Sequence, residues 1–170
     1  TVGLVEKFGE ERCFDTPLSE DAMTGFGLGA AINGMRPIHI HSRVDFLLLA
    51  MNQLGNMVSS YRYSSRGMFK VPIVIRAIIG RGWGQGYQHS KSMHSIFAHI
   101  PGLRVVLPTT PRDAKGLLTS AIRDDSPVTL ARQLIHYNPT TSLLDGLKET
   151  RSWFVKNQDE HLNKKNYFKE

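Results

Sequence analysis

The chain has 170 residues, of which 41% are hydrophobic and 21% are charged. This length matches a domain with a sizeable core, and the composition argues against a disordered, collagen-like or coiled-coil chain. No apolar run approaches the ~18 residues that a membrane-spanning helix needs, and no signal peptide is recognisable, so we expect a cytoplasmic protein without membrane contact. Cys13 is the only cysteine, which excludes a disulfide framework or a cysteine zinc site within this chain. The first residue is Thr1 and not methionine, which is consistent with a fragment.

The net charge of +6 is unevenly distributed along the sequence. No acidic residue occurs between Asp45 and Asp113, whereas eight of the 21 lysine and arginine residues lie there. Such a basic section is typical of a surface that faces nucleic acid, an anionic cofactor or substrate, or an acidic partner, and it also occurs in ordinary solvated surfaces. Charge alone leaves these readings open. Because the section matches no nucleic-acid-binding module, we expect no nucleic-acid partner.

The N-terminal half alternates predicted strands and helices. Ser19 is a suitable helix N-cap, because Glu20 and Asp21 follow in the first turn, where carboxylates stabilise the helix dipole. Gly34 ends this helix. The predicted elements are a short strand at 12–15, a helix at 19–33, a strand at 36–40, a helix at 45–60 and a polar loop at 61–70.

The C-terminal half continues this alternation, which predicts an α/β fold with a mostly parallel sheet and helices on both faces. Residues 71–79 (VPIVIRAII) are almost continuously apolar, as expected for a strand that is covered on both faces. Thr110, followed by Pro111 and Asp113, is typical of a capped helix start. After the strand at 71–79, the predicted elements are a glycine loop at 80–86, a helix at 90–100, a strand at 103–107, a helix at 110–124 and a strand at 127–134. We expect the α/β domain to span 1–137, and 138–170 to form a polar extension or linker.

Individual residues suggest function only weakly. The glycine loop follows a buried strand, at the edge where open α/β sheets bind ligands, and leads to His89, whose imidazole suits proton transfer but also fits an ordinary loop residue. Gly25 and Gly29 share one helix face, which predicts close approach of another helix, such as one across a subunit interface. His39 and His41 face the same side of a strand, but no carboxylate or cysteine is placed to complete a metal site, so we expect none.

Several motifs, taken in order, are much more specific. They are DTPLSE at 15–20, GFGLGA at 25–30, VPIVIR at 71–76, QHS at 88–90 and HIPGL at 99–103. Their order and spacing resemble the beta subunit of the thiamine-diphosphate-dependent 2-oxo acid dehydrogenase E1 component, in its pyrimidine-binding domain, which is shared more loosely with transketolase. The resemblance covers about 12–128 and implies the thiamine-diphosphate-binding fold.

The resemblance implies roles for four side chains. Glu20 would hydrogen-bond the aminopyrimidine ring of the cofactor, and a carboxyl group that shares a proton with this ring promotes ionisation of the thiazolium carbon. Phe46 would stack on the pyrimidine, and Ser42 would contact the cofactor. His89 would steady the carboxylate of the 2-oxo acid or shuttle protons.

The sequence departs from the family pattern in several ways. Ser42 stands where a bulky residue commonly contacts the cofactor, Arg43 adds a charge beside it, and Ala131 stands where a glutamate is usual. These changes bear on the substrate more than on the cofactor. The Gly-Asp-Gly…Asn motif that holds Mg²⁺ and the diphosphate in the family is absent, as is the family's C-terminal domain, so we expect an alpha-type E1 subunit to supply the missing half of the site.

We therefore expect the chain to contribute the pyrimidine half of the site to oxidative decarboxylation of a 2-oxo acid such as pyruvate or a branched-chain analogue. It would be inactive without its partner and would self-associate through the Gly25 and Gly29 face. Two alternatives stay open: a transketolase-like or synthase enzyme that acts on sugars, and a non-catalytic assembly or regulatory subunit with the same fold.

Overall fold

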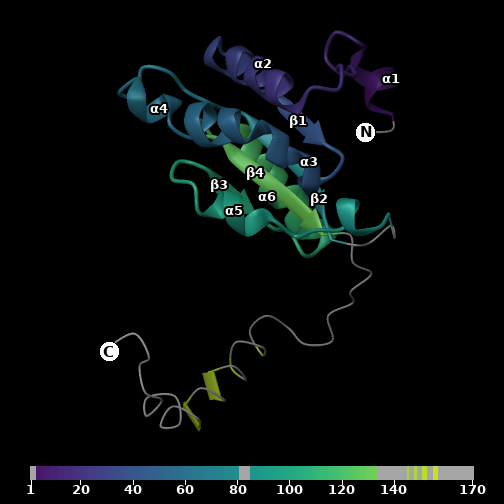
Figure 1. Ribbon diagram of the computed structural model, residues 1–170, viewed down its shortest axis with the longest axis vertical. Coiled ribbons are helices and arrows are strands. Elements are labelled where there is room, and N and C mark those ends of the chain that lie inside the picture. The colour runs from purple at the N-terminus through teal and green to yellow at the C-terminus, as the bar shows by residue number, and fades with distance from the viewer. Residues whose placement is uncertain are drawn as a thin grey trace. The chain divides into compact units, whose positions relative to one another are not determined.

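The computed structural model describes residues 3–80 and 85–133, together with 145, 148, 151, 152, 155 and 156. The chain divides into two units, Thr1–Ile135 and His136–Glu170, and the fold is that of the first unit (Figure 1). The predicted extension at 138–170 and residues 81–84 of the glycine loop lie largely or wholly outside the described residues. The extension and its boundary therefore stay predictions.

Within the described residues, parallel strands form a four-stranded sheet in the order β1-β2-β4-β3. Ile38 lies opposite Val74, and Val74 lies opposite Val128, so the strands begin at similar heights in the sheet. This arrangement confirms the predicted α/β fold with a parallel sheet. The strands are β1 (Ile38–His41), β2 (Val74–Ile79), β3 (Arg104–Val106) and β4 (Val128–Gln133).

Helices cover both faces of the sheet, as predicted (Figure 1). Ile75, Ala77 and Ile79 of β2 belong to the larger core, which also holds residues of α2, α3, η1, η2 and α5. Val74 packs on the other face against Ala121 of α6. The helical elements are α1 (Leu4–Phe8), α2 (Glu20–Ile32), α3 (Val44–Leu47), the 3₁₀ turn η1 (Leu48–Ala50), the π-helical η2 (Gln53–Val58), α4 (Tyr61–Ser64), the 3₁₀ turn η3 (Tyr87–His89), α5 (His94–Ala98) and α6 (Pro111–Arg123).

The glycines of α2 allow close packing within the chain itself. A Cβ atom on Gly25 would lie 3.2 Å from Oε1 of Gln53, and one on Gly27 would lie 3.0 Å from Cδ1 of Ile73. The Gln53 amide donates in turn to Asp21 of α2 at 3.2 Å. Gly25 is therefore explained by its own chain and not by another subunit. A Cβ on Gly29, in contrast, would meet no atom within 4 Å.

The helix predicted at 45–60 is confirmed as one continuous helical run from Val44 to Val58, along which the hydrogen bonding changes from α-helical (α3) through a 3₁₀ turn (η1) to π-helical (η2). The backbone N–H of Ser59 donates to the carbonyl of Leu54, five residues back, and its hydroxyl donates to the carbonyl of Gly55 at 2.7 Å. Serine hydroxyls that bond back to the preceding turn bend helices, and glycine weakens them. These local bonds widen the helix into a π turn.

Other element predictions succeed or fail for local reasons. The capped start of α6 is confirmed, since Thr110 Oγ1 accepts the backbone N–H of Asp113 at 3.1 Å. Ser19 occupies the N-cap position of α2, but its side chain makes no capping hydrogen bond. The strand predicted at 12–15 is wrong, because no strand pairs with this exposed segment. Three short helical elements, α1, α4 and η3, were not predicted. The helix predicted at 90–100 is shortened to α5.

Candidate functional site

A pocket of about 320 Å³ lies where the first turn of α2 faces the carboxyl end of β1. Ligands bind at this edge of open α/β sheets, because the loops that follow the strands meet there. The α2 side contributes the loop that precedes the helix, and the β1 side contributes the strand end and the start of α3. The lining residues are Thr16, Pro17, Leu18, Ser19, Glu20, Met23, His39, Ile40, His41, Ser42, Arg43 and Phe46.

Three of the predicted site residues meet in this pocket. Glu20 is half-buried in the first turn of α2, and its carbonyl accepts the hydroxyl of the buried Thr24 at 2.7 Å, which fixes the turn that carries the carboxylate. Ser42 and Phe46 enter from the opposite wall, and the Phe46 ring is 39% exposed. A carboxylate and an accessible aromatic face thus line the same small cavity.

The fourth predicted residue, His89, lies at the edge of this pocket and not among its lining residues. It ends η3, and its ring centroid lies 5.1 Å from that of Phe46, with 59° between the ring planes. Tilted aromatic pairs at this distance attract each other. Phe46 therefore connects the Glu20 pocket to the His89 imidazole.

Asp45 and Arg43 hold the segments around the pocket in place, a role that the sequence did not indicate for either side chain. Asp45 Oδ1 accepts the backbone N–H of Lys91 at 3.3 Å and lies 3.7 Å from its Nζ, and the carboxylate of Asp45 is 4% exposed. The carbonyl of Lys91 accepts the N–H of Gly80 at 2.9 Å. These contacts fasten the segment just after His89 to α3 and to the end of β2. No spacing in the sequence indicates them.

Arg43 is a buried cation in the pocket wall, with 2% of the residue exposed. Its Nη1 donates to the carbonyl of Gly80 at 3.2 Å, and its Nε donates to Oε1 of Gln85 at 3.2 Å. The guanidinium therefore binds both ends of the glycine loop. The sequence indicated only an extra charge near the site, whereas the structure shows a link between the pocket and this loop.

His39 and His41 share one side of β1, as predicted, and their rings meet edge to face with centroids 4.3 Å apart. Desolvation lowers the pKa of His39, and desolvation with the repulsion of His39 lowers the pKa of His41 to about 4. Both imidazoles are therefore neutral near pH 7. Their Nε2 atoms are buried and have no hydrogen-bond partner among the described residues, so each is available to a polar group in the pocket.

No group of three or more histidine, cysteine, aspartate or glutamate side chains that could hold a metal ion occurs among the described residues. No helix in that part of the chain has the length and apolarity needed to cross a membrane. Ala131, the third departure noted above, lies in β4 opposite Ala77 of β2.

The fold and the pocket define a domain of the transketolase type. The family model described as "Transketolase, pyrimidine binding domain" matches residues 1–137, and the chain belongs to this family.

The most informative relatives are beta subunits of 2-oxo acid dehydrogenases. The chain is 50% identical over 128 residues to the 2-oxoisovalerate dehydrogenase subunit beta of Bacillus subtilis (strain 168), a match that covers 75% of this chain and 39% of the relative. It is 46% identical over 138 residues to the chloroplastic pyruvate dehydrogenase E1 component subunit beta-4 of Oryza sativa subsp. japonica. This match covers 81% of this chain and 34% of the relative. The chain thus spans well under half the length of these relatives.

A solved structure shares the fold. The split gene transketolase, as an inactive beta4 tetramer, superposes with a TM-score of 0.65 at 18% identity, over 84% of this chain and 43% of that one. At this identity the likeness supports the fold and says nothing of activity.

Proposed function

We propose that the chain is the pyrimidine-binding part of a beta-type subunit of a thiamine-diphosphate-dependent 2-oxo acid dehydrogenase. The observation that carries this proposal is the meeting of Glu20 and Phe46 in one pocket of a pyrimidine-binding domain. The names of the relatives favour pyruvate or a branched-chain 2-oxo acid as substrate.

The donor set of the pocket fits an aminopyrimidine. Glu20 supplies a carboxylate, Phe46 supplies an aromatic face, and His39 and His41 each supply a neutral imidazole whose Nε2 has no hydrogen-bond partner among the described residues. Such a ring needs a flat apolar surface for stacking and polar atoms around its edge. When bound, thiamine diphosphate supplies the carbon nucleophile that allows a 2-oxo acid to lose carbon dioxide.

The proposal assigns a role to each of these side chains. Glu20 would share a proton with a ring nitrogen of the pyrimidine, and Phe46 would stack on the ring. His89 lies beyond Phe46, where it can transfer a proton to the reacting substrate or hold its carboxylate. Ser42 lines the same pocket and would contact the cofactor.

The proposal requires a partner chain. No cluster of carboxylates suited to Mg²⁺ occurs in the part of the chain that the structure describes, so an alpha-type E1 subunit would hold the metal ion and the diphosphate. We expect the chain alone to bind thiamine diphosphate weakly and to be inactive. Isothermal titration calorimetry tests this, and tight Mg²⁺-dependent binding by the chain alone would contradict it.

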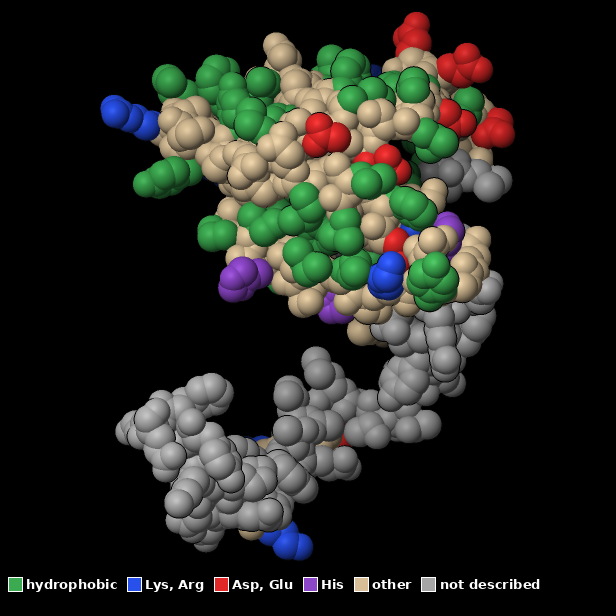
Figure 2. Space-filling model, in the orientation of Figure 1, with side chains coloured by type: hydrophobic (Ala, Val, Ile, Leu, Met, Phe, Trp, Pro, Cys, Tyr) green, Lys and Arg blue, Asp and Glu red, His purple; other side chains and the backbone are tan. Residues whose placement is uncertain are grey.

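Self-association belongs to the same proposal, with Gly29 in place of Gly25 as its centre. Phe26 lies one turn before Gly29 on α2 and is 65% exposed, and Leu49 of η1 is 62% exposed. Figure 2 shows further hydrophobic side chains spread over the face that carries α2, α3 and α4. We propose this face as the interface, because exposed apolar patches mark sites of protein interaction.

The decisive experiment is Glu20→Gln in the complex reconstituted with an alpha-type subunit. We expect an intact fold, because glutamine is tolerated in a first helical turn, and loss of hydrogen–deuterium exchange at the thiazolium carbon. Glu10→Gln, an exposed position outside the pocket, is the control. Normal exchange in Glu20→Gln would refute the assignment of the carboxylate.

His89→Ala tests the other half of the site. We expect turnover to fall by about 10²–10⁴ with little change in cofactor affinity, the range for loss of a general acid–base or electrostatic group. His99→Ala changes an exposed histidine outside the pocket and is the matched control. If His89→Ala loses cofactor while bound cofactor still turns over normally, the histidine is structural. Product analysis with pyruvate, branched-chain 2-oxo acids and ketose phosphates identifies the donor.

A further inference from the structure

A second pocket, of about 830 Å³, lies at the amino ends of β3 and β4, at the opposite edge of the sheet from Glu20. Its walls come from α4 and the turn after it, from the start of β3, and from the two residues before β4. We call it the arginine pocket, because Arg62, Arg66 and Arg104 all line it. All three belong to the section of the sequence that contains no acidic residue.

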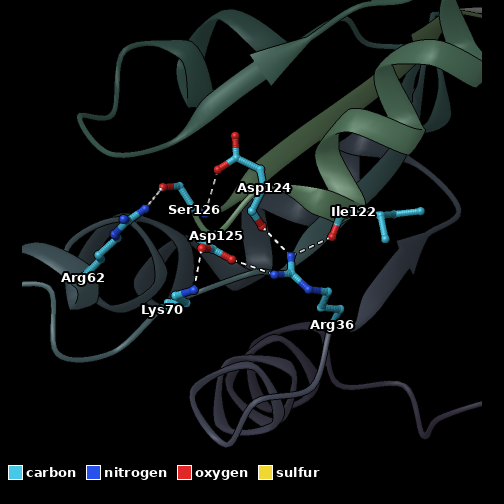
Figure 3. Close-up of polar contacts among 7 residues, drawn as sticks. All are labelled: Arg36, Arg62, Lys70, Ile122, Asp124, Asp125 and Ser126. Carbon is cyan, nitrogen blue, oxygen red and sulfur yellow. Dashed lines mark hydrogen bonds and ion pairs between the residues drawn. The ribbon is translucent and has the colours of Figure 1, made fainter.

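The carboxylates of the Asp124–Asp125 turn, beside the arginine pocket, are already matched by cations, and Figure 3 shows the two cations that contact Asp125. Asp125 pairs with Arg36 at 2.6 Å and with Lys70 at 2.7 Å. The hydrogen bonds from Lys70 and then Arg36 hold the pKa of Asp125 below its ordinary value, so it is ionised. Asp124 pairs with Arg104. These carboxylates therefore leave no negative charge for the remaining arginines.

Two guanidinium groups of the pocket lack an acidic partner among the described residues. Arg62 donates through Nη1 to the hydroxyl of Ser126, a neutral group (Figure 3). The side chain of Arg66 has no hydrogen bond or ion pair to any described residue. The pocket thus carries an excess of positive charge that a bound anion would neutralise.

The backbone at Arg66 provides independent support. Its φ is +54°, and among the described residues it alone, apart from glycines, has a positive φ. The turn is closed by hydrogen bonds from the N–H of Arg66 to Tyr63 and from the N–H of Gly67 to Arg62, both at 2.9 Å. Glycine or asparagine would adopt this conformation at lower cost. An arginine held at a strained position beside two other arginines points to a use for its charge.

We propose that the arginine pocket binds a small anion that carries phosphoryl groups. Guanidinium groups match phosphate oxygens with paired hydrogen bonds, and the hydroxyl of Ser126 and the basic groups surround a volume within the range of small-molecule sites. Two cations without acidic partners favour an anion of two or more charges, such as a diphosphate. This site is separate from the Glu20 pocket and does not depend on the proposed function.

Calorimetry of the full chain with pyrophosphate tests the proposal. We expect Arg66→Asn and Arg62→Gln each to weaken pyrophosphate binding by about tenfold, the loss typical of one charged hydrogen bond. Arg112→Asn, which removes the same charge from an exposed site on α6 outside the pocket, should bind as the wild type does.

A second readout distinguishes a ligand-binding arginine from a structural one. Arg66→Gly relieves the positive φ, so we expect a higher melting temperature in the absence of ligand together with weaker pyrophosphate binding. Pyrophosphate affinity equal to that of the wild type in Arg66→Asn and Arg66→Gly would overturn the proposal, as would failure of the wild type to bind millimolar pyrophosphate. Binding of a hexaglutamate peptide without binding of pyrophosphate would also overturn it and would identify the pocket as a surface for an acidic protein segment.

Discussion

Acidification is expected to destabilise the folded domain through His41, and His41→Leu is expected to remove most of that contribution. His41 is 7% exposed, and desolvation followed by the repulsion of His39 lowers its pKa from 6.5 to about 4. Between these two pH values the unfolded chain binds a proton on this imidazole and the folded chain does not. The free energy of unfolding therefore falls as the pH decreases through this window.

The magnitude follows from the two pKa values of His41. Well above pH 6.5 the His41 imidazole is neutral in both the folded and the unfolded chain, and it has no effect on stability. Below the pKa of the folded state, the loss of unfolding free energy reaches its limit of about 3 kcal/mol. About 2 kcal/mol of this loss falls between pH 7 and pH 5. The lowered pKa of His39 adds a loss of the same sign, which His41→Leu retains.

Urea unfolding followed by circular dichroism at both pH values measures this effect. We expect His41→Leu to lose about 2 kcal/mol less stability than the wild type between pH 7 and pH 5. His99→Leu, at an exposed position, should lose as much as the wild type. If His41→Leu and the wild type lose the same amount, the imidazole of His41 is not held neutral by burial and the reasoning is wrong.

Three further substitutions test the packing and the site. Gly102→Ala is expected to cost about 3 kcal/mol or more of stability, because φ is +89° and a Cβ would collide with the carbonyl of Ser59, and an unchanged melting temperature would contradict this crowding. Gly29→Ala should raise the free energy of unfolding by about 0.5–1 kcal/mol, since the added methyl meets no atom within 4 Å. The same substitution should weaken self-association through this helix face, and light scattering that shows unchanged self-association would exclude the face as the interface. Asp45→Asn should lower turnover of the reconstituted enzyme by about tenfold to a hundredfold through loss of the Lys91 contact, with an unchanged melting temperature, and normal turnover would exclude a positioning role.

Local signals explain which elements could be predicted. The apolar run that ends in β2 and the capped start of α6 depend on neighbouring residues in the sequence, and both are confirmed. The strand at 12–15 was wrong because a strand exists only where another strand pairs with it, and pairing is not a local property. The helix predicted at 45–60 is present, and only its hydrogen-bond pattern differs from a regular α-helix, near the end where the Ser59 hydroxyl donates to the carbonyl of Gly55.

The candidate site was likewise predicted only in part. Glu20, Ser42, Phe46 and His89 were identified by the order of motifs, and the structure brings the first three into one pocket with His89 beside the Phe46 ring. The motif order could not show that Arg43 turns towards the glycine loop, since the direction of a buried side chain depends on which carbonyls lie within reach.

The amino-acid sequence was enough to predict the α/β class, most strands and helices, the family, and three side chains of the Glu20 pocket, because periodicity, capping and motif order are properties of the linear chain. The strand order, the neutral state of His39 and His41, and the charge balance of the arginine pocket could be read only from the three-dimensional fold. Arg62 and Arg66 are distant in sequence both from Arg104 and from the Asp124–Asp125 turn. Burial and ion pairing depend on distances in space, and the fold sets those distances by placing the amino ends of β3 and β4 beside the turn after α4.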